Sequence, residues 1–212
     1  MTADMERGMQ LLIQDLLRKG VGDQRVLTAM KAVPRHCFVP EKMRHLSYSL
    51  RPLPIGMGQS ISTPYIVASM TELLELEGHE KVLEIGAGCG YQTAVLCETA
   101  GQVHSLEIIP EVAALGRRNL QQLGYNAEVV VGDGSTGLPE QAPFDRILIA
   151  ATAPRIPQVL FDQLGEGGIL VAPVERGQDE ELVRYRKTSR GIHSQSLYGV
   201  RFVPMTGLVR EN

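Results

Sequence analysis

Three glycines at alternate positions, Gly86, Gly88 and Gly90, follow an apolar run at residues 82–85 and precede a segment with helical periodicity. Glycine accepts positive φ angles and lets a ligand approach the backbone closely. The pattern therefore predicts a buried strand, a tight turn and a helix around a binding site. Amides at the start of that helix would point at whatever occupies the turn. A purely structural turn remains the alternative, because short glycine motifs also match by chance.

The glycine spacing and two acidic residues narrow the class of ligand. Dinucleotide sites favour G-x-G-x-x-G, whereas here the third glycine comes one position early, which disfavours NAD. Glu107 ends the next apolar run, where a doubly wound sheet presents a carboxylate to ribose hydroxyls. Glu84 lies inside an apolar run, and a cationic ligand near it would offset the cost of burying its charge. S-adenosylmethionine carries a ribose and a sulfonium cation, so we expect it as the cofactor.

A second group of polar side chains follows a segment rich in proline and glycine. Residues 48–62 contain two prolines and two glycines, which predicts an ordered loop of the kind that often carries function. Ser60, Ser62 and Thr63 then precede Pro64, which suits the first turn of a helix. Hydroxyls at a helix amino end can bind an anion, because the free amides and the helix dipole favour negative charge. A simple helix cap by Ser62 or Thr63 stays open as the other interpretation.

The elements that must position these residues follow from hydrophobic periodicity. Strand and helix patterns alternate from residue 81 onward, which predicts an α/β fold with a doubly wound, mostly parallel sheet. N-terminal helices are expected over 5–19 and 23–32, and C-terminal antiparallel strands over 181–188 and 195–204. The core elements are expected as strands at 81–86, 102–107, 127–132, 145–151 and 168–174, and as helices at 91–100, 110–123 and 156–164.

Two loops at the carboxyl ends of strands complete the crevice in which such folds bind ligands. One contains Asp133 and Gly134, and the other spans 150–154. Asp133 can accept a hydrogen bond from an adenine amino group, although an Asp-Gly turn also occurs without any ligand.

Composition excludes several classes of function. A net charge of -3 and a pI near 6.0 give no electrostatic footprint for nucleic acid. The sequence shows neither a basic and apolar leader nor an apolar run long enough for a membrane span, so we expect a soluble, cytoplasmic protein. Cys37, Cys89 and Cys97 have no spacing typical of disulfides or zinc, and His36 beside Cys37 lacks a third partner. We therefore expect no metal.

Several segments together resemble one known family, protein-L-isoaspartate O-methyltransferase. They are PLPIGMGQSISTPYIVASMTELLEL (52–76), VLEIGAGCGYQTAVL (82–96), VVGDGSTGLPEQAPFDRILIAATAP (130–154), LGEGGILVAPV (164–174) and VRFVPMTG (200–207). The glycine motif is shared by many methyltransferases, whereas GQSISTPYIV is more diagnostic of this family. The resemblance implies a Rossmann-like methyltransferase fold that transfers a methyl group from S-adenosylmethionine to the carboxylate of L-isoaspartyl residues. The products are S-adenosylhomocysteine and an ester that collapses to a succinimide, which starts protein repair.

The resemblance also implies roles for individual residues. Ser62 falls on the family's active hydroxyl, and Leu50 replaces a residue that is commonly Asp or Asn, which puts the peptide preference in doubt. The family's strand order near the carboxyl terminus is expected to vary from other methyltransferases. The cofactor positions fall on Ser60, Ile61, Gly86, Ala87, Gly88, Cys89, Glu107, Asp133, Gly134 and Thr206.

A single domain of 1–212 is expected, in which 1–76 covers the substrate and 77–212 forms the cofactor-binding α/β core. Its partners would be proteins and peptides that contain isoaspartate, without nucleic acid or membrane, and we expect a monomer. Two rival functions remain: a methyltransferase for a small molecule or RNA, and a cofactor-binding module without catalysis. The SISTPY segment and the acidic charge balance argue against the first.

Overall fold

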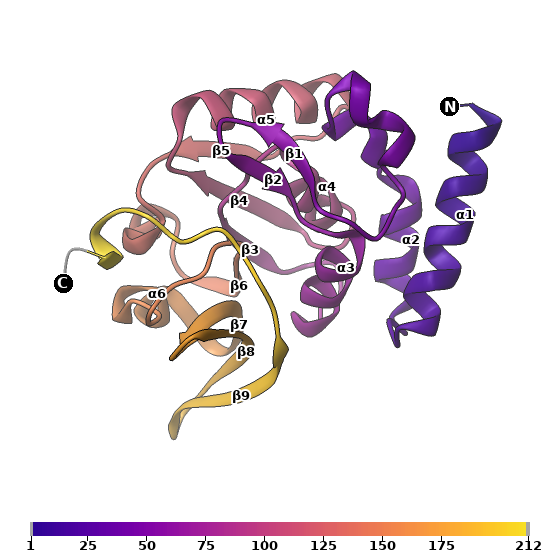
Figure 1. Ribbon diagram of the computed structural model, residues 1–212. Coiled ribbons are helices and arrows are strands. Elements are labelled where there is room, and N and C mark those ends of the chain that lie inside the picture. The colour runs from indigo at the N-terminus through magenta and orange to yellow at the C-terminus, as the bar shows by residue number, and fades with distance from the viewer. Residues whose placement is uncertain (1, 211–212) are drawn as a thin grey trace.

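A computed structural model describes residues 2–210, with the side chain of Arg210 left out. Its central sheet has helices on both faces, and a pair of N-terminal helices lies at one end of the molecule (Figure 1). The α-helices are α1 (Ala3–Arg18), α2 (Gln24–Ala32), α3 (Pro64–Leu73), α4 (Tyr91–Cys97), α5 (Pro110–Gln122) and α6 (Gln158–Gln163). Short 3-10 helices are η1 (Arg35–Phe38), η2 (Glu41–Leu46), η3 (Gly134–Thr136), η4 (Pro139–Gln141) and η5 (Leu208–Arg210).

Seven strands form the main sheet in the order β5-β4-β3-β6-β7-β8-β9. The neighbours from β5 to β7 pair in parallel, and β8 and β9 continue as an antiparallel meander at the edge. The expected fold class, with its antiparallel C-terminal strands, is confirmed. The strands are β3 (Lys81–Ile85), β4 (Gln102–Glu107), β5 (Glu128–Val131), β6 (Phe144–Ile149), β7 (Leu164–Arg176), β8 (Asp179–Thr188) and β9 (Gly191–Gly199).

Alternation along the strands sends side chains to two covered faces, which explains the continuous apolar runs in the sequence. On one face, Val82 and Leu148 pack with residues of α3 and α4. On the other face, Leu83 and Ile147 pack with residues of α6 and of the C-terminal segment. The helices change face between β3 and β6, so the sheet has its switch point there. Ligands bind outside the carboxyl ends of strands at such a point.

The first two helices form as expected from their caps and apolar spacing. The side chain of Thr2 accepts a hydrogen bond from the Met5 amide at the start of α1, and Asp23 accepts two amides at the start of α2. The buried residues of α1 recur at helical spacing and pack against α2, beside which α1 runs in Figure 1. Thr63, and not Ser62, caps α3 by accepting the Ile66 amide at 3.2 Å.

The segment 48–62 is not a plain loop, which corrects the expectation from its composition. It contains a two-stranded antiparallel hairpin of β1 (Leu53–Gly56) and β2 (Gln59–Ile61). Met57, at the tip, has a φ of 52° and lies between two glycines that also have positive φ. The prolines and glycines therefore shape the edge and the turn of a small ribbon. This ribbon ends directly at Ser62.

One hydrophobic cluster joins the N-terminal elements to the sheet domain. It contains Leu16, Met30 and Val67 from the first 76 residues together with Tyr91 and Leu120 from the remainder.

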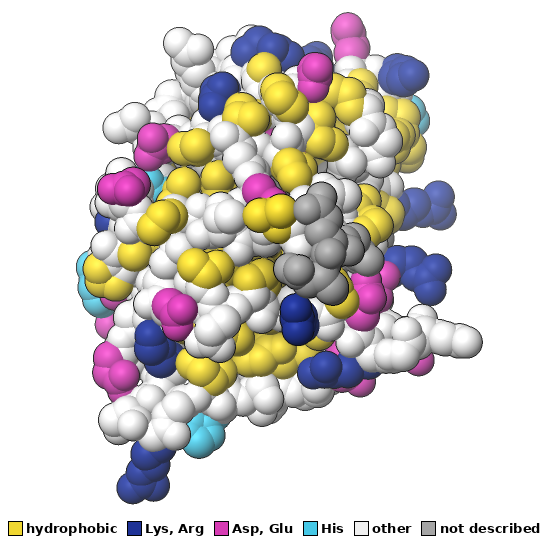
Figure 2. Space-filling view, turned by 90° about the vertical axis from the view of Figure 1, so that its left-hand side faces the viewer, with side chains coloured by type: hydrophobic (Ala, Val, Ile, Leu, Met, Phe, Trp, Pro, Cys, Tyr) yellow, Lys and Arg dark blue, Asp and Glu magenta, His cyan; other side chains and the backbone are white. Residues whose placement is uncertain are grey.

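Within the described residues, no helix combines the length and apolarity that a membrane crossing needs. Figure 2 shows one side of the molecule, on which basic side chains lie mostly near the margin.

Candidate active site

A cavity of about 960 Å³, including its open mouth, lies where the carboxyl ends of β3, β4, β5 and β6 meet. Four further pieces of chain contribute to its wall. The β2 end supplies residues 59–62, the start of α4 supplies Tyr91 and Gln92, α3 supplies Val67, and the C-terminal segment supplies residues 203–206. A cleft at the carboxyl ends of parallel strands, beside the switch point of the sheet, is where folds of this kind bind their ligands.

The glycine turn forms one wall of the cavity. Gly86 and Gly90 have φ angles of 93° and 88°, which side chains rarely adopt. A Cβ on Gly90 would also lie 3.0 Å from the Leu120 side chain, so this third glycine lets α4 pack against α5. The amides of Gly86 and Ala87 donate to the Leu106 carbonyl, and the Asn119 side chain donates to the Cys89 carbonyl. These bonds hold the turn in a fixed shape.

Glu107 ends β4 at the cavity wall and is only 8% exposed. One of its carboxylate oxygens accepts the Gly88 amide at 3.0 Å, and the other accepts the Ile109 amide at 3.0 Å. A carboxylate has about four acceptor positions, so each oxygen keeps capacity for another donor. Glu107 thus links the glycine turn to the start of α5 and presents acceptors to the cavity.

Ser62 lies between the hairpin and the start of α3, and it lines the same cavity. Its carbonyl accepts a hydrogen bond of 2.7 Å from Arg35. No hydrogen bond within residues 2–210 uses its hydroxyl, although the residue is half-buried. The positive end of α3 adds to the preference of this position for an anion.

The structure brings ten of the eleven predicted site residues to one cavity, although they come from five separate stretches of the chain. The ten are Ser60, Ile61, Ser62, Gly86, Ala87, Gly88, Cys89, Glu107, Gly134 and Thr206. Burial raises the pKa of the Cys89 thiol to about 11, so this side chain is neutral in the wall.

Asp133 is the predicted residue that does not line the cavity. One carboxylate oxygen accepts the amide and the hydroxyl of Ser135, and the other accepts the Leu208 amide at 2.8 Å. Burial raises the pKa of Asp133, but these hydrogen bonds outweigh burial and hold it below its ordinary value. Asp133 therefore ties the C-terminal segment, which carries Thr206, to the end of β5.

Glu84 also lies away from the cavity, which corrects the expectation that it would face a cationic ligand. Its side chain is fully buried between β3, β4 and α4 and accepts hydrogen bonds from Thr93 at 2.5 Å and Ser105 at 2.6 Å. Its other oxygen has no partner among the described residues. Burial raises the pKa of Glu84 to about 7, so the carboxyl group is largely protonated in mildly acidic solution.

Replacement of Glu84 by glutamine is expected to remove a pH dependence from the stability. Because the folded pKa of about 7 exceeds the ordinary value of 4.5, the folded state binds more protons between these values. The stability due to Glu84 is complete below pH 4.5 and is lost as the pH rises towards 7. Between pH 5 and pH 7 the wild type should lose about 2 kcal/mol of unfolding free energy relative to Glu84→Gln. Urea unfolding of both proteins at the two pH values measures this difference. Parallel pH profiles would contradict it.

The cavity wall also contains residues that sequence reasoning missed. Tyr91 and Gln92 follow directly after the glycine turn, and their position at a helix start was the signal that pointed to them. Ile108 follows Glu107 and is 36% exposed at the rim. Val203 and Met205 lie in the segment 200–207, whose family resemblance was the signal that pointed to this stretch. They reach the wall because the C-terminal segment pairs with Thr152, which accepts the Met205 amide at 2.7 Å.

Other candidate positions have structural partners. His36 lies 2.8 Å from the Tyr48 hydroxyl and, like Leu50, is not part of the cavity wall. Leu50 packs against the hydrophobic cluster that joins the N-terminal elements to the sheet.

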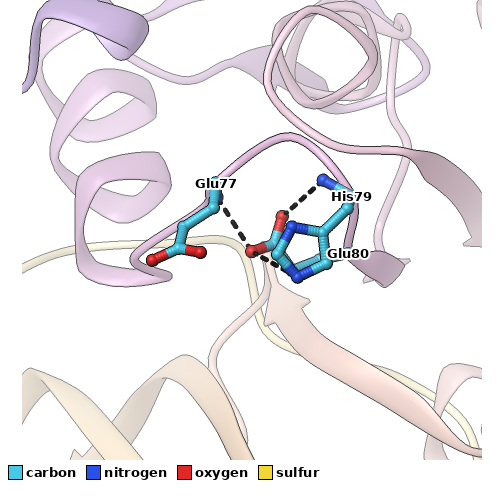
Figure 3. Close-up of side chains that lie close together, drawn as sticks. All are labelled: Glu77, His79 and Glu80. Carbon is cyan, nitrogen blue, oxygen red and sulfur yellow. Dashed lines mark hydrogen bonds and ion pairs between the residues drawn. The ribbon is translucent and has the colours of Figure 1, made fainter.

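Ligand atoms of Glu77, His79 and Glu80 lie within 4.8 Å of one another, a spacing that a metal ion could use (Figure 3). The buried Glu80 carboxylate, however, already accepts the amides of Glu77, Gly78 and His79. The Arg146 guanidinium lies 3.8 Å from the same carboxylate. Because its oxygens already have amide donors and a neighbouring cation, the Glu80 carboxylate is better explained as a residue that stabilises the turn before β3 than as a metal ligand.

Comparison with known proteins agrees with this geometry. The family model for protein-L-isoaspartate(D-aspartate) O-methyltransferase matches residues 7–210. A relative named protein-L-isoaspartate O-methyltransferase from Methanoculleus marisnigri is 52% identical over 190 residues, which cover 89% of this chain and 86% of the relative. A relative named protein-L-isoaspartate O-methyltransferase 1 from Syntrophobacter fumaroxidans is 52% identical over 193 residues, which cover 91% of this chain and 90% of the relative.

Two solved structures show the same fold. One, titled protein-L-isoaspartate O-methyltransferase, has a TM-score of 0.86 at 27% identity and covers 95% of this chain and 67% of its own. Another, from Plasmodium falciparum and in complex with S-adenosyl-L-homocysteine, has a TM-score of 0.80 at 24% identity. The match covers 92% of this chain and 96% of that structure's chain. The family model and the close relatives decide the assignment: this chain belongs to the protein-L-isoaspartate O-methyltransferase family.

Proposed function

We propose that the cavity brings S-adenosylmethionine and the carboxylate of an L-isoaspartyl residue together beside the Ser62 hydroxyl. Family membership supplies the reaction, which is S-adenosylmethionine-dependent methylation of isoaspartyl residues in protein repair. The assignment of the catalytic hydroxyl to Ser62 rests on the position of this residue. It lines the cavity, follows the hairpin, and has a hydroxyl that is not used within the described chain.

The wall of the cavity fits the cofactor. Glu107 would accept the ribose hydroxyls, and the turn of Gly86, Ala87, Gly88 and Cys89 would follow the amino acid part of the cofactor. The further positions proposed for cofactor binding are Ser60, Ile61, Gly134 and Thr206. A Cβ on Gly134 would meet the Ile85 side chain, so glycine at this position lets the turn after β5 pack closely against the end of β3.

Bound S-adenosylmethionine supplies a methyl group that its sulfonium charge activates. A carboxylate is already ionised at neutral pH, so this chain has no need of a general base. Ser62 would donate a hydrogen bond to one carboxylate oxygen and hold the other in line with the methyl group at about 3 Å, and such orientation can lower the barrier by several kcal/mol. Held in this way, the carboxylate oxygen would form the bond to the methyl carbon as the carbon–sulfur bond breaks, with the electron pair of that bond left on sulfur.

The two halves of the chain would divide the work. Residues 77–212 would form the cofactor-binding core, and residues 1–76 would cover the substrate. Support comes from the cavity wall, to which residues 59–62 and Val67 contribute together with the glycine turn, and from the hydrophobic cluster shared by both parts. This cover would exclude water from a reaction in which two charges neutralise each other.

The test is methyl transfer from labelled S-adenosylmethionine to two peptides that differ only in an isoaspartyl or an ordinary aspartyl linkage. Base-labile label on the isoaspartyl peptide alone is the expected result. Equal label on both peptides would refute the substrate selectivity. Cofactor binding without label would reduce the chain to a binding module.

Asp133 is proposed to act on the cofactor through the segment that it holds, since its carboxylate bonds Leu208 outside the cavity wall. Asp133→Ala should weaken S-adenosylhomocysteine binding about fivefold, because loss of the bond to Leu208 frees the segment that carries Thr206 and only part of that energy reaches the cofactor. For an analogue of S-adenosylhomocysteine with hydrogen in place of the adenine amino group, Asp133→Ala should weaken binding by the same factor. Thr136→Ala, which removes a bond to the Asp133 carbonyl only, is the control. A smaller loss with the analogue would show a direct bond from Asp133 to adenine.

A monomer in the cytoplasm is also proposed. The exposed large hydrophobic side chains are spread over several elements, and the three cysteines are free. Light scattering of the purified protein measures its mass, and a dimer would refute the first part.

A further inference from the structure

Arg35 is a fully buried cation directly behind the wall of the cavity. Its side chain is 0% exposed, and it is the first residue of η1. Its Nη2 donates to the Ser62 carbonyl at 2.7 Å, and its Nε donates to the Ser47 carbonyl at 2.8 Å. The guanidinium carbon lies 4.7 Å from the centre of the Tyr91 ring. Ser62 and Tyr91 both line the cavity, so Arg35 contacts two parts of its wall.

The positive charge of Arg35 has no anionic partner in residues 2–210. Arg35 takes part in none of the ion pairs between them, and its Nη1 has no hydrogen-bond acceptor. The ionisable groups around it are Tyr91, Cys89 and Tyr48. Burial raises the pKa of each of these three groups, so all are neutral at pH 7.

An uncompensated buried charge is costly. Two carbonyl dipoles and an aromatic face offset part of that cost, whereas a nearby anion would offset more. The substrate of the proposed reaction brings such an anion to the hydroxyl of Ser62, the residue whose carbonyl Arg35 holds. After methyl transfer the same group is a neutral ester, so the attraction is lost when the product must leave.

We propose that Arg35 is a positioning residue for the methyl acceptor: it fixes the main chain of Ser62, and its buried charge favours a carboxylate over a neutral group beside the Ser62 hydroxyl. This inference rests on the proposed role of Ser62. A purely structural arginine that only joined the Ser47 and Ser62 carbonyls would change stability on replacement. It would not change the discrimination between a charged and a neutral ligand.

The experiment compares Arg35→Met and Arg35→Lys in the full-length protein loaded with S-adenosylhomocysteine. The ligands are an isoaspartyl peptide and the same peptide with its free carboxylate converted to a carboxamide, and calorimetry gives both dissociation constants. The wild type should bind the carboxylate peptide about tenfold more tightly than the carboxamide. Arg35→Met should reduce this ratio to about twofold, because an unscreened charge interaction is removed. Should Arg35→Met fail to fold, Arg35→Gln takes its place.

Arg35→Lys separates charge from geometry. Lysine keeps the charge but lacks the planar fork that reaches two carbonyls. The binding ratio should stay within about twofold of the wild-type ratio, while kcat falls about tenfold because Ser62 is less firmly held. Arg25→Met is the matched control, since it removes a bond of 2.9 Å from a guanidinium to the Leu76 carbonyl away from the cavity. It should leave both the ratio and kcat unchanged.

The outcomes separate this inference from the proposed function. An unchanged binding ratio in Arg35→Met, or wild-type kcat in Arg35→Lys, would overturn the role of Arg35. A wild type that methylates isoaspartyl peptide but binds both peptides equally would overturn the charge preference and leave the proposed function standing. A wild type that does not methylate the isoaspartyl peptide would overturn the proposed function itself.

Discussion

Replacement of Ser62 by alanine is expected to lower kcat about 100-fold and to leave the dissociation constant of S-adenosylmethionine within twofold of the wild-type value. Ser62 lines the cavity and its hydroxyl bonds to nothing in residues 2–210, so the folded protein loses no internal hydrogen bond when the hydroxyl is removed. A hydrogen bond to a charged group contributes about 1.5–3 kcal/mol. If that bond also orients the carboxylate, most of its free energy lowers the activation barrier of methyl transfer. A change of about 2.7 kcal/mol in that barrier equals two orders of magnitude in kcat.

Steady-state kinetics with an isoaspartyl peptide, together with calorimetric titration of the cofactor, measure both quantities. Thr63→Ala is the matched control, because Thr63 is the adjacent hydroxyl and caps α3 without lining the cavity. That variant should lose about 1 kcal/mol of stability and retain its kcat. Ser62→Thr, which keeps a hydroxyl, should recover part of the activity. A parallel loss of cofactor affinity in Ser62→Ala would place Ser62 in the cofactor group instead.

The elements that are fixed by local pattern could be predicted from the sequence. The apolar runs that became β3, β6 and β7 are continuous because both faces of each strand are covered. Asp23 and Pro64 mark helix starts through capping and through a preset φ angle, and the structure begins α2 and α3 there. The carboxyl ends of parallel strands lie at one edge of a sheet, so Gly86, Glu107 and Gly134 could be expected in one cavity.

The features that depend on pairing between distant residues could not be predicted in this way. Proline and glycine at residues 52–58 indicate a turn, but the β1–β2 ribbon also needs Met57 at a positive φ, which composition does not show. Glu84 appeared to need a cationic ligand because its donors, Thr93 and Ser105, come from an adjoining helix and an adjacent strand.

The same limit applies to Arg35 and Asp133. Arg35 is one of many arginines in the sequence, and only the fold places it 2.7 Å from the Ser62 carbonyl, 27 positions away. The position of Asp133 after a strand favoured a role at the cavity, whereas its bond to Leu208 spans 75 positions. Side chains of this kind are assigned by the contacts that tertiary structure creates.

Replacement of Glu107 by alanine should raise the dissociation constant of S-adenosylmethionine more than about 100-fold, because two kinds of interaction disappear together. The carboxylate would lose its proposed bonds to the ribose hydroxyls, and bonds of this type to a charged acceptor contribute about 1.5–3 kcal/mol each. The amides of Gly88 and Ile109 would also lose their acceptor, which frees the glycine turn. Glu107→Gln, which keeps one oxygen, should fall between alanine and wild type.

Glu111→Ala serves as the control for the change in charge, since Glu111 is an exposed acid in the first turn of α5 and does not line the cavity. Its cofactor affinity should equal that of the wild type. Because Glu107 is proposed to bind cofactor and not the methyl acceptor, Glu107→Ala saturated with S-adenosylmethionine should recover most of the wild-type kcat. That recovery is the opposite of the result expected for Ser62→Ala, so the two variants together separate the cofactor half of the cavity from the substrate half. An unchanged dissociation constant in Glu107→Ala would refute the ribose role and leave Glu107 only as the acceptor that holds the turn.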